Sequence, residues 1–208
     1  MNTTENILTD IHFFENESVS SLNETGTRLA KAGKMQEAEE NYLKAIELDS
    51  HYPQSYHNLG ILQAAQQRTK ESIRNLEKLI ELEPGIAKHY CNLGIVYYLE
   101  GSFYESELFF SKALEIDKNH PDTLFNLGKL LFNLERTDEA IILIERFLDM
   151  DNADTEAMYI LSMCFRKINN KENAILYCEK TLDIDPDYRE ARKMLKELKG
   201  PDVKFNIS

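Results

Sequence analysis

Cysteine is scarce in this chain of 208 residues. The three cysteines, Cys91, Cys164 and Cys178, are too few and too scattered for a disulfide framework or a CxxC metal site. We therefore expect buried, reduced thiols and a reducing compartment, which makes the cytoplasm the predicted location. The N-terminal stretch MNTTENILTDIHFFENE contains no positive segment and no long apolar core, so we do not expect a secretory signal.

Long apolar runs and clustered positive charge are also missing. No run approaches the roughly 18–20 apolar residues that a membrane-spanning helix needs, so membrane insertion is not expected. Lys and Arg number 24 against 36 Asp and Glu, which gives a formal net charge of −12. Because phosphate groups are bound by clustered Lys and Arg, this charge argues against nucleic acid and anionic membranes as partners.

Catalytic signatures are absent as well. The stretch GTRLAKAGKM at 26–35 has the wrong spacing for a phosphate-binding loop and places Met35 where Ser or Thr holds magnesium. No HExxH, GxSxG or GxGxxG occurs. The five histidines fall at different helical phases and form no ligand set, and His89 is not spaced to act as a base for Cys91. The sequence therefore predicts neither catalysis, nor a metal, nor a cofactor.

What the sequence does contain is an internal repeat of 34 residues, marked by Asn-Leu-Gly at 58–60, 92–94 and 126–128. Two further columns recur at the same interval in five units. One holds small residues: Ala38, Ser72, Ser106, Ala140 and Ala174. The other, four residues later, holds larger and mostly apolar residues: Tyr42, Leu76, Phe110, Ile144 and Cys178. No insertion separates the units, so one structural motif occurs five times.

Each unit contains two segments with helical spacing. In the third unit, Tyr90, Leu93, Gly94 and Tyr97 follow the i, i+3, i+4, i+7 pattern of one helix face. A break at Gly101 separates the two segments, as Gly33 does in the first unit. Small residues at Gly94 and Ser106 would let the paired backbones approach closely. Since neither helix covers its apolar face alone, the pairs are predicted to stack on their neighbours.

These columns resemble the tetratricopeptide repeat (TPR) family over residues 19–188. The third unit fits the family pattern best, at Tyr90, Leu93, Gly94, Tyr97, Gly101, Phe110 and Ala113. The departures, which put local stability in doubt more than the fold, are Thr25, Gln63, Gln67, Ser162 and Cys178.

The resemblance implies an all-α, right-handed solenoid of helix-turn-helix repeats. We predict an N-terminal amphipathic segment or cap at 1–18, a C-terminal capping helix at 189–199 with Ala191, Leu195 and Leu198 on one face, and a tail at 200–208. The five repeats are predicted at 19–52, 53–86, 87–120, 121–154 and 155–188. The N-terminal segment would either cap the first repeat or dock into a groove.

The resemblance also assigns the first helix of each unit to the concave wall of the solenoid. The residues expected to contact a peptide there are Asn58, Ile61, Lys88, Asn92, Ile95, Tyr98, Phe125, Asn126, Lys129, Phe132, Tyr159 and Arg166. Asn58, Asn92 and Asn126 would form a carboxamide ladder that hydrogen-bonds an extended chain, and the apolar side chains would form pockets. Alternatively, each Asn bonds a neighbouring backbone group and the apolar residues pack between helices.

One specialisation of the family, the clamp for a C-terminal carboxylate in heat-shock co-chaperones, is matched only in part. Asn58 and Lys88 agree with its pattern, whereas Asn23, Thr27 and Asn92 replace its other three groups. In the family pattern two of the three replaced groups are cations, so a carboxylate bound to this chain would lose charge-assisted hydrogen bonds. We therefore do not expect a general receptor for chaperone tails.

The predicted function is a non-catalytic protein-interaction module or assembly scaffold that binds a peptide or protein segment in a concave groove. One alternative is self-assembly into a homo-oligomer through the N-terminal segment or the ends of the array. Another is the substrate-recruiting or regulatory part of a larger enzyme complex. A peptide-sensing transcription regulator is not favoured, because the acidic chain has no room for a DNA-binding helix-turn-helix with a basic surface.

Overall fold

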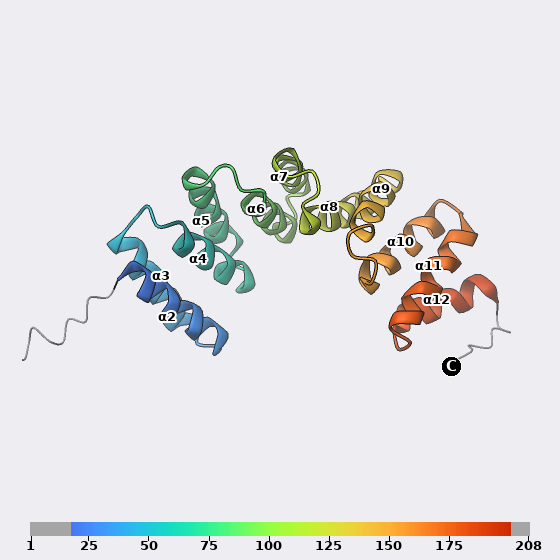
Figure 1. The fold of residues 1–208 in the computed structure, drawn as a ribbon, viewed down its shortest axis with the longest axis horizontal. Helices are drawn as coiled ribbons and strands as arrows, with labels where there is room; N and C mark the ends of the chain where they lie inside the picture. The colour runs from blue at the N-terminus through green and yellow to red at the C-terminus, as the bar shows by residue number, and fades with distance from the viewer. Residues whose placement is uncertain (1–17, 201–208) are drawn as a thin grey trace, which may run out of the picture. The chain divides into compact units, whose positions relative to one another are not determined.

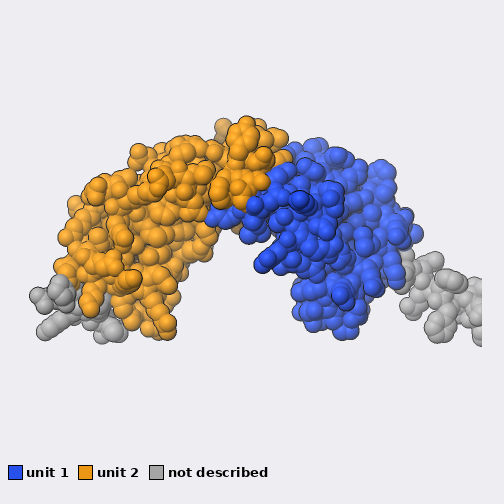
Figure 2. All heavy atoms as spheres, turned by 180° about the vertical axis from the view of Figure 1, so that it is seen from behind, with its two compact units in different colours: residues 1–100 blue, residues 101–208 orange. Residues whose placement is uncertain are grey.

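The computed structural model describes residues 18–200, and in that range the chain is entirely helical, with no strand (Figure 1). The predicted segment at 1–18, apart from Ser18, and the tail beyond Gly200 lie outside the described residues. The chain divides into two compact units, residues 1–100 and 101–208, coloured separately in Figure 2. Each unit is described by itself below.

Unit 1 holds α2 (Val19–Lys31), α3 (Met35–Leu48), α4 (Pro53–Ala65), α5 (Thr69–Leu82) and α6 (Ala87–Glu100). Unit 2 holds α7 (Phe103–Ile116), α8 (Pro121–Asn133), α9 (Thr137–Leu148), α10 (Thr155–Lys167), α11 (Lys171–Ile184) and α12 (Arg189–Lys199). The even-numbered helices from α2 to α10 are the first helices of the repeats, and α3, α5, α7, α9 and α11 are the second helices. The all-α repeat fold predicted from the columns is therefore confirmed.

Within each unit, consecutive helices pack as pairs, and the pairs pack on their neighbours. In unit 1, α2 packs on α3 and α4 on α5, with further contacts of α3 with α4 and of α5 with α6. In unit 2, α8 packs on α9 and α10 on α11 in the same way. This order follows from the sequence, because each helix carries an apolar face that only its neighbours in the array can cover.

Close backbone approach in the pairs α2–α3, α4–α5 and α8–α9 depends on the glycine of the repeated triplet. A Cβ atom placed on Gly60 would lie 2.9 Å from Cγ of Leu76, and one on Gly128 would lie 2.7 Å from Cγ1 of Ile144. The column of small residues predicted from the repeat is fully buried on the second helices: Ala38, Ser72, Ser106, Ala140 and Ala174. Small side chains on both partners thus let large residues such as Leu76 and Ile144 fill the space between the helices.

The turn inside each pair uses a left-handed residue at the same position in every repeat. Gly33 and Gly101 have φ values of 79° and 87°, which confirms the predicted breaks. The equivalent residues Gln67, Glu135 and Asn169 have φ values of 61°, 65° and 59°. Glycine takes this conformation at no steric cost, whereas Gln and Glu are strained in it. The turn geometry is therefore kept even where the sequence does not favour it.

The C-terminal helix α12 covers the end of the last pair. It begins at Arg189 and ends at Lys199, as predicted, and it packs on α11. Ala191, Met194 and Leu195 are buried, and Leu198 packs against the cluster of Cys178, Met194 and Leu195. Gly200 follows at a φ of 92°. All three cysteines are buried, as expected, and burial raises the pKa of Cys164 to about 12.

Candidate functional site

The predicted contact residues lie on the first helices of both units. In unit 1, Asn58 and Ile61 are on α4, whereas Lys88, Asn92, Ile95 and Tyr98 are on α6. In unit 2, Phe125, Asn126, Lys129 and Phe132 are on α8, whereas Tyr159 and Arg166 are on α10. Contacts join α4 with α6 and α8 with α10, so each unit brings its own group of these residues onto neighbouring helices.

In unit 2, part of the predicted group lines a cavity of about 260 Å³, called here the aromatic pocket. Three predicted residues, Lys129, Phe132 and Tyr159, contribute to it. Its other walls come from Asn133, Glu156, Ile160, Met163 and Tyr188. Phe125, Asn126 and Arg166 do not line it, although Phe125 lies beneath the Lys129 ammonium group, 5.0 Å from the ring centroid.

The aromatic pocket combines an apolar interior with charge at its edge. The Tyr159 and Tyr188 rings lie 5.1 Å apart between centroids and are tilted by 41°, within the distance at which aromatic pairs attract each other. Lys129 Nζ lies 2.6 Å from Glu156 Oε1, and both side chains remain partly exposed. Burial is the main cause that raises the pKa values of Tyr159 and Tyr188, so both phenols stay neutral. Such a pocket suits an apolar side chain flanked by polar groups.

Two lining residues could have been found from the sequence. Glu156 is three residues before Tyr159 and therefore shares its helix face. Ile160 lies at the column of the repeated Asn, where the fifth repeat has no carboxamide. Tyr188 could not be found in this way, because it precedes α12 and reaches the pocket only through the packing of that helix on α11.

The three ladder asparagines have different environments. Asn58 Nδ2 donates to Asn23 Oδ1 at 3.0 Å and to Thr27 Oγ1 at 3.3 Å, both on α2. Asn126 Nδ2 donates to the carbonyl of Asp122 at 2.7 Å, one turn earlier on α8. Asn92 Nδ2 is buried and has no hydrogen-bond partner among residues 18–200. A bound chain would therefore compete with internal acceptors at Asn58 and Asn126.

The repeat register explains why Asn92 is left without an acceptor. Between α2 and α4, Asn23 Oδ1 accepts from both Asn58 Nδ2 and Ser55 Oγ, which is 3.4 Å away. One repeat later, His57 stands at the position of Asn23, His89 at that of Ser55, and Ile61 at that of Thr27. Ile61 has no acceptor atom where Thr27 has a hydroxyl oxygen, and His57 has an imidazole where Asn23 has a carboxamide oxygen. Asn92 therefore lacks both of the acceptors that Asn58 uses.

The two histidines form a contact between α4 and α6. Their ring centroids are 6.2 Å apart, and the Nδ1 atoms of both are buried without a partner in the described part of the chain. His89 Nε2 lies 2.8 Å from Glu83 Oε2. Burial, followed by the nearby charges of His89 and Lys88, lowers the pKa of His57, while Glu83 opposes this effect.

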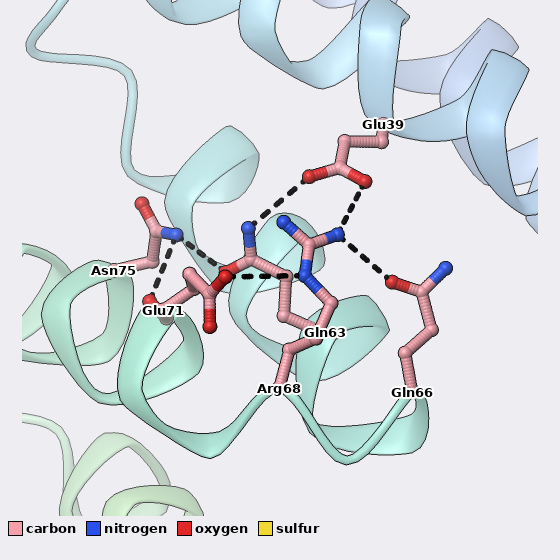
Figure 3. A network of polar contacts seen from close by, with 6 residues as sticks. All are labelled: Glu39, Gln63, Gln66, Arg68, Glu71 and Asn75. Carbon is pink, nitrogen blue, oxygen red and sulfur yellow. Dashed lines mark hydrogen bonds and ion pairs between the residues drawn. The ribbon is translucent and has the colours of Figure 1, made fainter.

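A polar network joins the second helices of unit 1 (Figure 3). Arg68 Nη1 donates to Glu39 Oε2 at 2.7 Å, and Gln63 Nε2 donates to Glu39 Oε1 at 3.3 Å. Asn75 Nδ2 in turn donates to Gln63 Oε1 at 2.7 Å. The guanidinium of Arg68 holds the pKa of Glu39 below its usual range. Gln63, a departure from the aromatic residue of the family pattern, is therefore buried with its amide satisfied.

Across 18–200, no three His, Cys, Asp or Glu side chains gather in a way that could hold a metal ion. Within the same range, no helix combines the length and the apolar character that crossing a bilayer requires.

Family models place this architecture in a known class. Those described as TPR repeat or tetratricopeptide repeat match residues 26–67, 57–121, 109–142 and 155–197. The chain therefore belongs to the tetratricopeptide repeat family, whose fold is generally a non-catalytic interaction module. No curated protein matches the chain as a whole.

Solved structures with the same fold include three proteins at low sequence identity. YrrB, described as a TPR protein with an unusual peptide-binding site, has 23% identity and a TM-score of 0.71, covering 90% of this chain and 97% of that one. The pilF protein of Pseudomonas aeruginosa has 18% identity and a TM-score of 0.78, covering 88% and 83%. MamA has 18% identity and a TM-score of 0.71, covering 77% and 94%. At these identities the likeness establishes the fold alone.

Proposed function

We propose that this protein binds a segment of another protein along its first helices, with the aromatic pocket of unit 2 as the anchor for an apolar side chain. The observation that carries this proposal is the cavity between α8 and α10, which three predicted contact residues line. Buried aromatic anchors supply most of the affinity at protein interfaces. The peptide-binding site named for YrrB supports the same use of the fold.

Unit 1 would contribute polar contacts rather than an apolar anchor. Ile61 is 41% exposed on α4, and Lys88 is exposed on α6. Asn58 and Asn92 can add hydrogen bonds only by exchanging an internal partner or by uncovering a buried nitrogen. The carboxamide ladder is therefore a secondary element of the proposal, and the aromatic pocket is the primary one.

The test begins with peptides selected by display on the full chain, whose affinities are then measured by fluorescence anisotropy. Phe132→Ala should weaken binding by at least about 30-fold, because truncating a hot-spot aromatic costs about 2 kcal/mol or more. Tyr104→Ala serves as the matched control, since Tyr104 is 78% exposed on α7 and lies outside the pocket.

Circular dichroism of each variant separates lost binding from lost folding. Unchanged affinity of folded Phe132→Ala would contradict the proposal. Light scattering at the same concentrations tests the alternative of self-assembly, which predicts a mass above that of the monomer without any added peptide.

A further inference from the structure

A second cavity, of about 640 Å³, opens between α9 and α11 in unit 2 and shares no residue with the aromatic pocket. We call it the acidic notch. Leu148, Met158 and Ile184 give it apolar surface. Three carboxylates also line it: Glu145 and Asp149 near the end of α9, and Asp183 on α11. Among residues 18–200, none of these three carboxylates has an ion-pair partner.

The acidic notch borders the end of α9, which differs from the ends of the other second helices. The C-cap residues Asp49, Glu83, Asp117 and Asp185 of the other second helices have φ values between −145° and −120°. The next position in this series would be Asp151, but α9 ends at Leu148, and Asp149 caps it with a helical φ of −63° and ψ of −23°. Asp151 N still donates to the Phe147 carbonyl at 3.0 Å, as Asp117 N donates to that of Ala113, and Asp149 and Asn152 border the opening.

The loop after each second helix contains a backbone carbonyl that accepts a side-chain hydrogen bond in every repeat except the one at the notch. The position recurs every 34 residues, and in four repeats a side chain donates to it. Tyr56 Oη donates to the Ser50 carbonyl at 3.1 Å, and Tyr90 Oη donates to the Pro84 carbonyl at 3.0 Å. Arg146 Nη2 donates to the Lys118 carbonyl at 2.6 Å, and Arg192 Nη2 donates to that of Pro186.

In the fourth repeat, the carbonyl at this position is that of Asn152, and no side chain among residues 18–200 donates to it as in the other repeats. Met158 stands where Tyr56 and Tyr90 stand in their repeats, and it cannot donate. Lys180 stands where Arg146 stands, but its ammonium lies over the Tyr177 ring, 4.7 Å from the centroid. The acidic notch is thus equivalent to the site one repeat earlier where the Arg146 guanidinium binds the Lys118 carbonyl.

The chain also shows how carboxylates hold an arginine between neighbouring second helices. Arg68 bridges Glu39 of α3 and Glu71 of α5 (Figure 3). Arg136 does the same between Glu107 of α7, at 2.5 Å, and Glu139 of α9, at 2.6 Å. The planar guanidinium suits this role because it donates several hydrogen bonds in fixed directions.

We infer that the acidic notch is a docking site for an arginine side chain of a partner protein. The guanidinium would donate to the Asn152 carbonyl and to the carboxylates of Glu145 and Asp149, in place of the internal arginine that this repeat lacks. The methylene groups of the arginine would lie on Leu148, Met158 and Ile184, since long basic side chains cover apolar surface with their stems. This site is independent of the aromatic pocket and of the function proposed for it.

The test uses a fluorescein-labelled peptide of sequence Gly-Leu-Arg-Leu-Gly and the same peptide with citrulline, which keeps the shape of arginine without its charge. The arginine peptide should bind the full chain with a Kd below about 1 mM, and at least tenfold more tightly than the citrulline peptide. Its affinity should fall as salt rises, because exposed charges are screened.

Two variants locate the binding. Lys180→Arg should abolish it, because the new guanidinium can fold back into the notch as Arg146 does, and Lys171→Arg on the same helix is the control. Glu145→Gln should weaken binding about tenfold, with Glu172→Gln as its control. Phe132→Ala should leave it unchanged. Equal binding of the two peptides, or full affinity in folded Lys180→Arg and Glu145→Gln, would overturn the inference.

Discussion

The two units build the same helix pairs with different side-chain chemistry. In unit 1, polar side chains occupy the contacts between successive pairs: Asn23 with Asn58, His57 with His89, and Glu39 with Gln63 and Arg68. In unit 2, rings pack inside the helix pairs, Phe125 with Phe147 and Phe165 with Tyr177. Between successive pairs of unit 2, Arg136 bridges Glu107 and Glu139 as Arg68 bridges Glu39 and Glu71 in unit 1. The repeat therefore requires a given shape at each position but not a given chemistry.

This difference has a consequence for specificity. Polar contacts in unit 1 are directional and titratable, so one substitution can leave several atoms without partners, as at Asn92. Apolar contacts in unit 2 tolerate substitution more easily, and two cavities lie between helices there, the aromatic pocket and the acidic notch. We therefore expect the pockets of unit 2 to bind partners and the contacts of unit 1 to set stability and its dependence on pH.

The largest expected effect comes from truncating the core of one unit at a time. Leu76 and Ile144 occupy the same repeat position in units 1 and 2, and both are fully buried. Leu76→Ala and Ile144→Ala should each cost about 2–5 kcal/mol of unfolding free energy. Hydrogen exchange should show the loss of protection mainly in the unit that carries the substitution, because repeats contact only their neighbours. Equal loss in both units would show that they unfold as one.

A smaller effect is expected from restoring the missing acceptor between α4 and α6. His57→Asn places a carboxamide at the position of Asn23, where its oxygen can accept from Asn92 Nδ2. The substitution should stabilise unit 1 by about 0.5–1.5 kcal/mol, as measured by urea unfolding. Ser21→Asn, at an exposed residue of α2, is a control for the side chain itself. Destabilisation by His57→Asn would contradict the register argument.

Acid should weaken unit 1 more than unit 2. Because burial, His89 and Lys88 lower the pKa of His57, with Glu83 opposing them, the unfolded chain binds a proton there more readily than the folded chain. Stability from this group is complete above the ordinary pKa of about 6.5 and is lost as the pH falls below it. Hydrogen exchange at about pH 7.5 and 5.5 should show the difference, and His57→Asn should remove it.

The smallest effect concerns the left-handed turns. Gln67→Gly in unit 1 should stabilise the chain by about 0.5–1 kcal/mol, because glycine takes a φ of 61° without strain. Glu135→Gly in unit 2 should gain less, since Glu135 also accepts from Lys167 Nζ at 3.2 Å. Thermal unfolding of the two variants measures the stabilisation by each substitution. A larger stabilisation by Glu135→Gly than by Gln67→Gly would contradict this expectation.

Sequence reasoning reached the fold almost completely, whereas the binding site that it named stays a prediction. The 34-residue columns located the helices, the small buried residues from Ala38 to Ala174, and the capping helix, because packing in an array is local and periodic. It also named Lys129, Phe132 and Tyr159, which do line a cavity. It did not find Tyr188 or the hydrogen-bond partners of Asn58, because these depend on how one repeat meets the next. The bond from Asn126 to the Asp122 carbonyl is of the kind that the alternative interpretation described.

The sequence by itself determined that this protein is a stack of helix pairs, because five copies of one apolar pattern can be buried only against each other. Tertiary structure alone decided where the stack leaves polar atoms and space without a partner, as at Asn92 and in the acidic notch. The physical reason is that burial depends on a periodic pattern that a sequence displays. Hydrogen bonds and cavities depend instead on individual atoms from separate repeats meeting within a few ångströms.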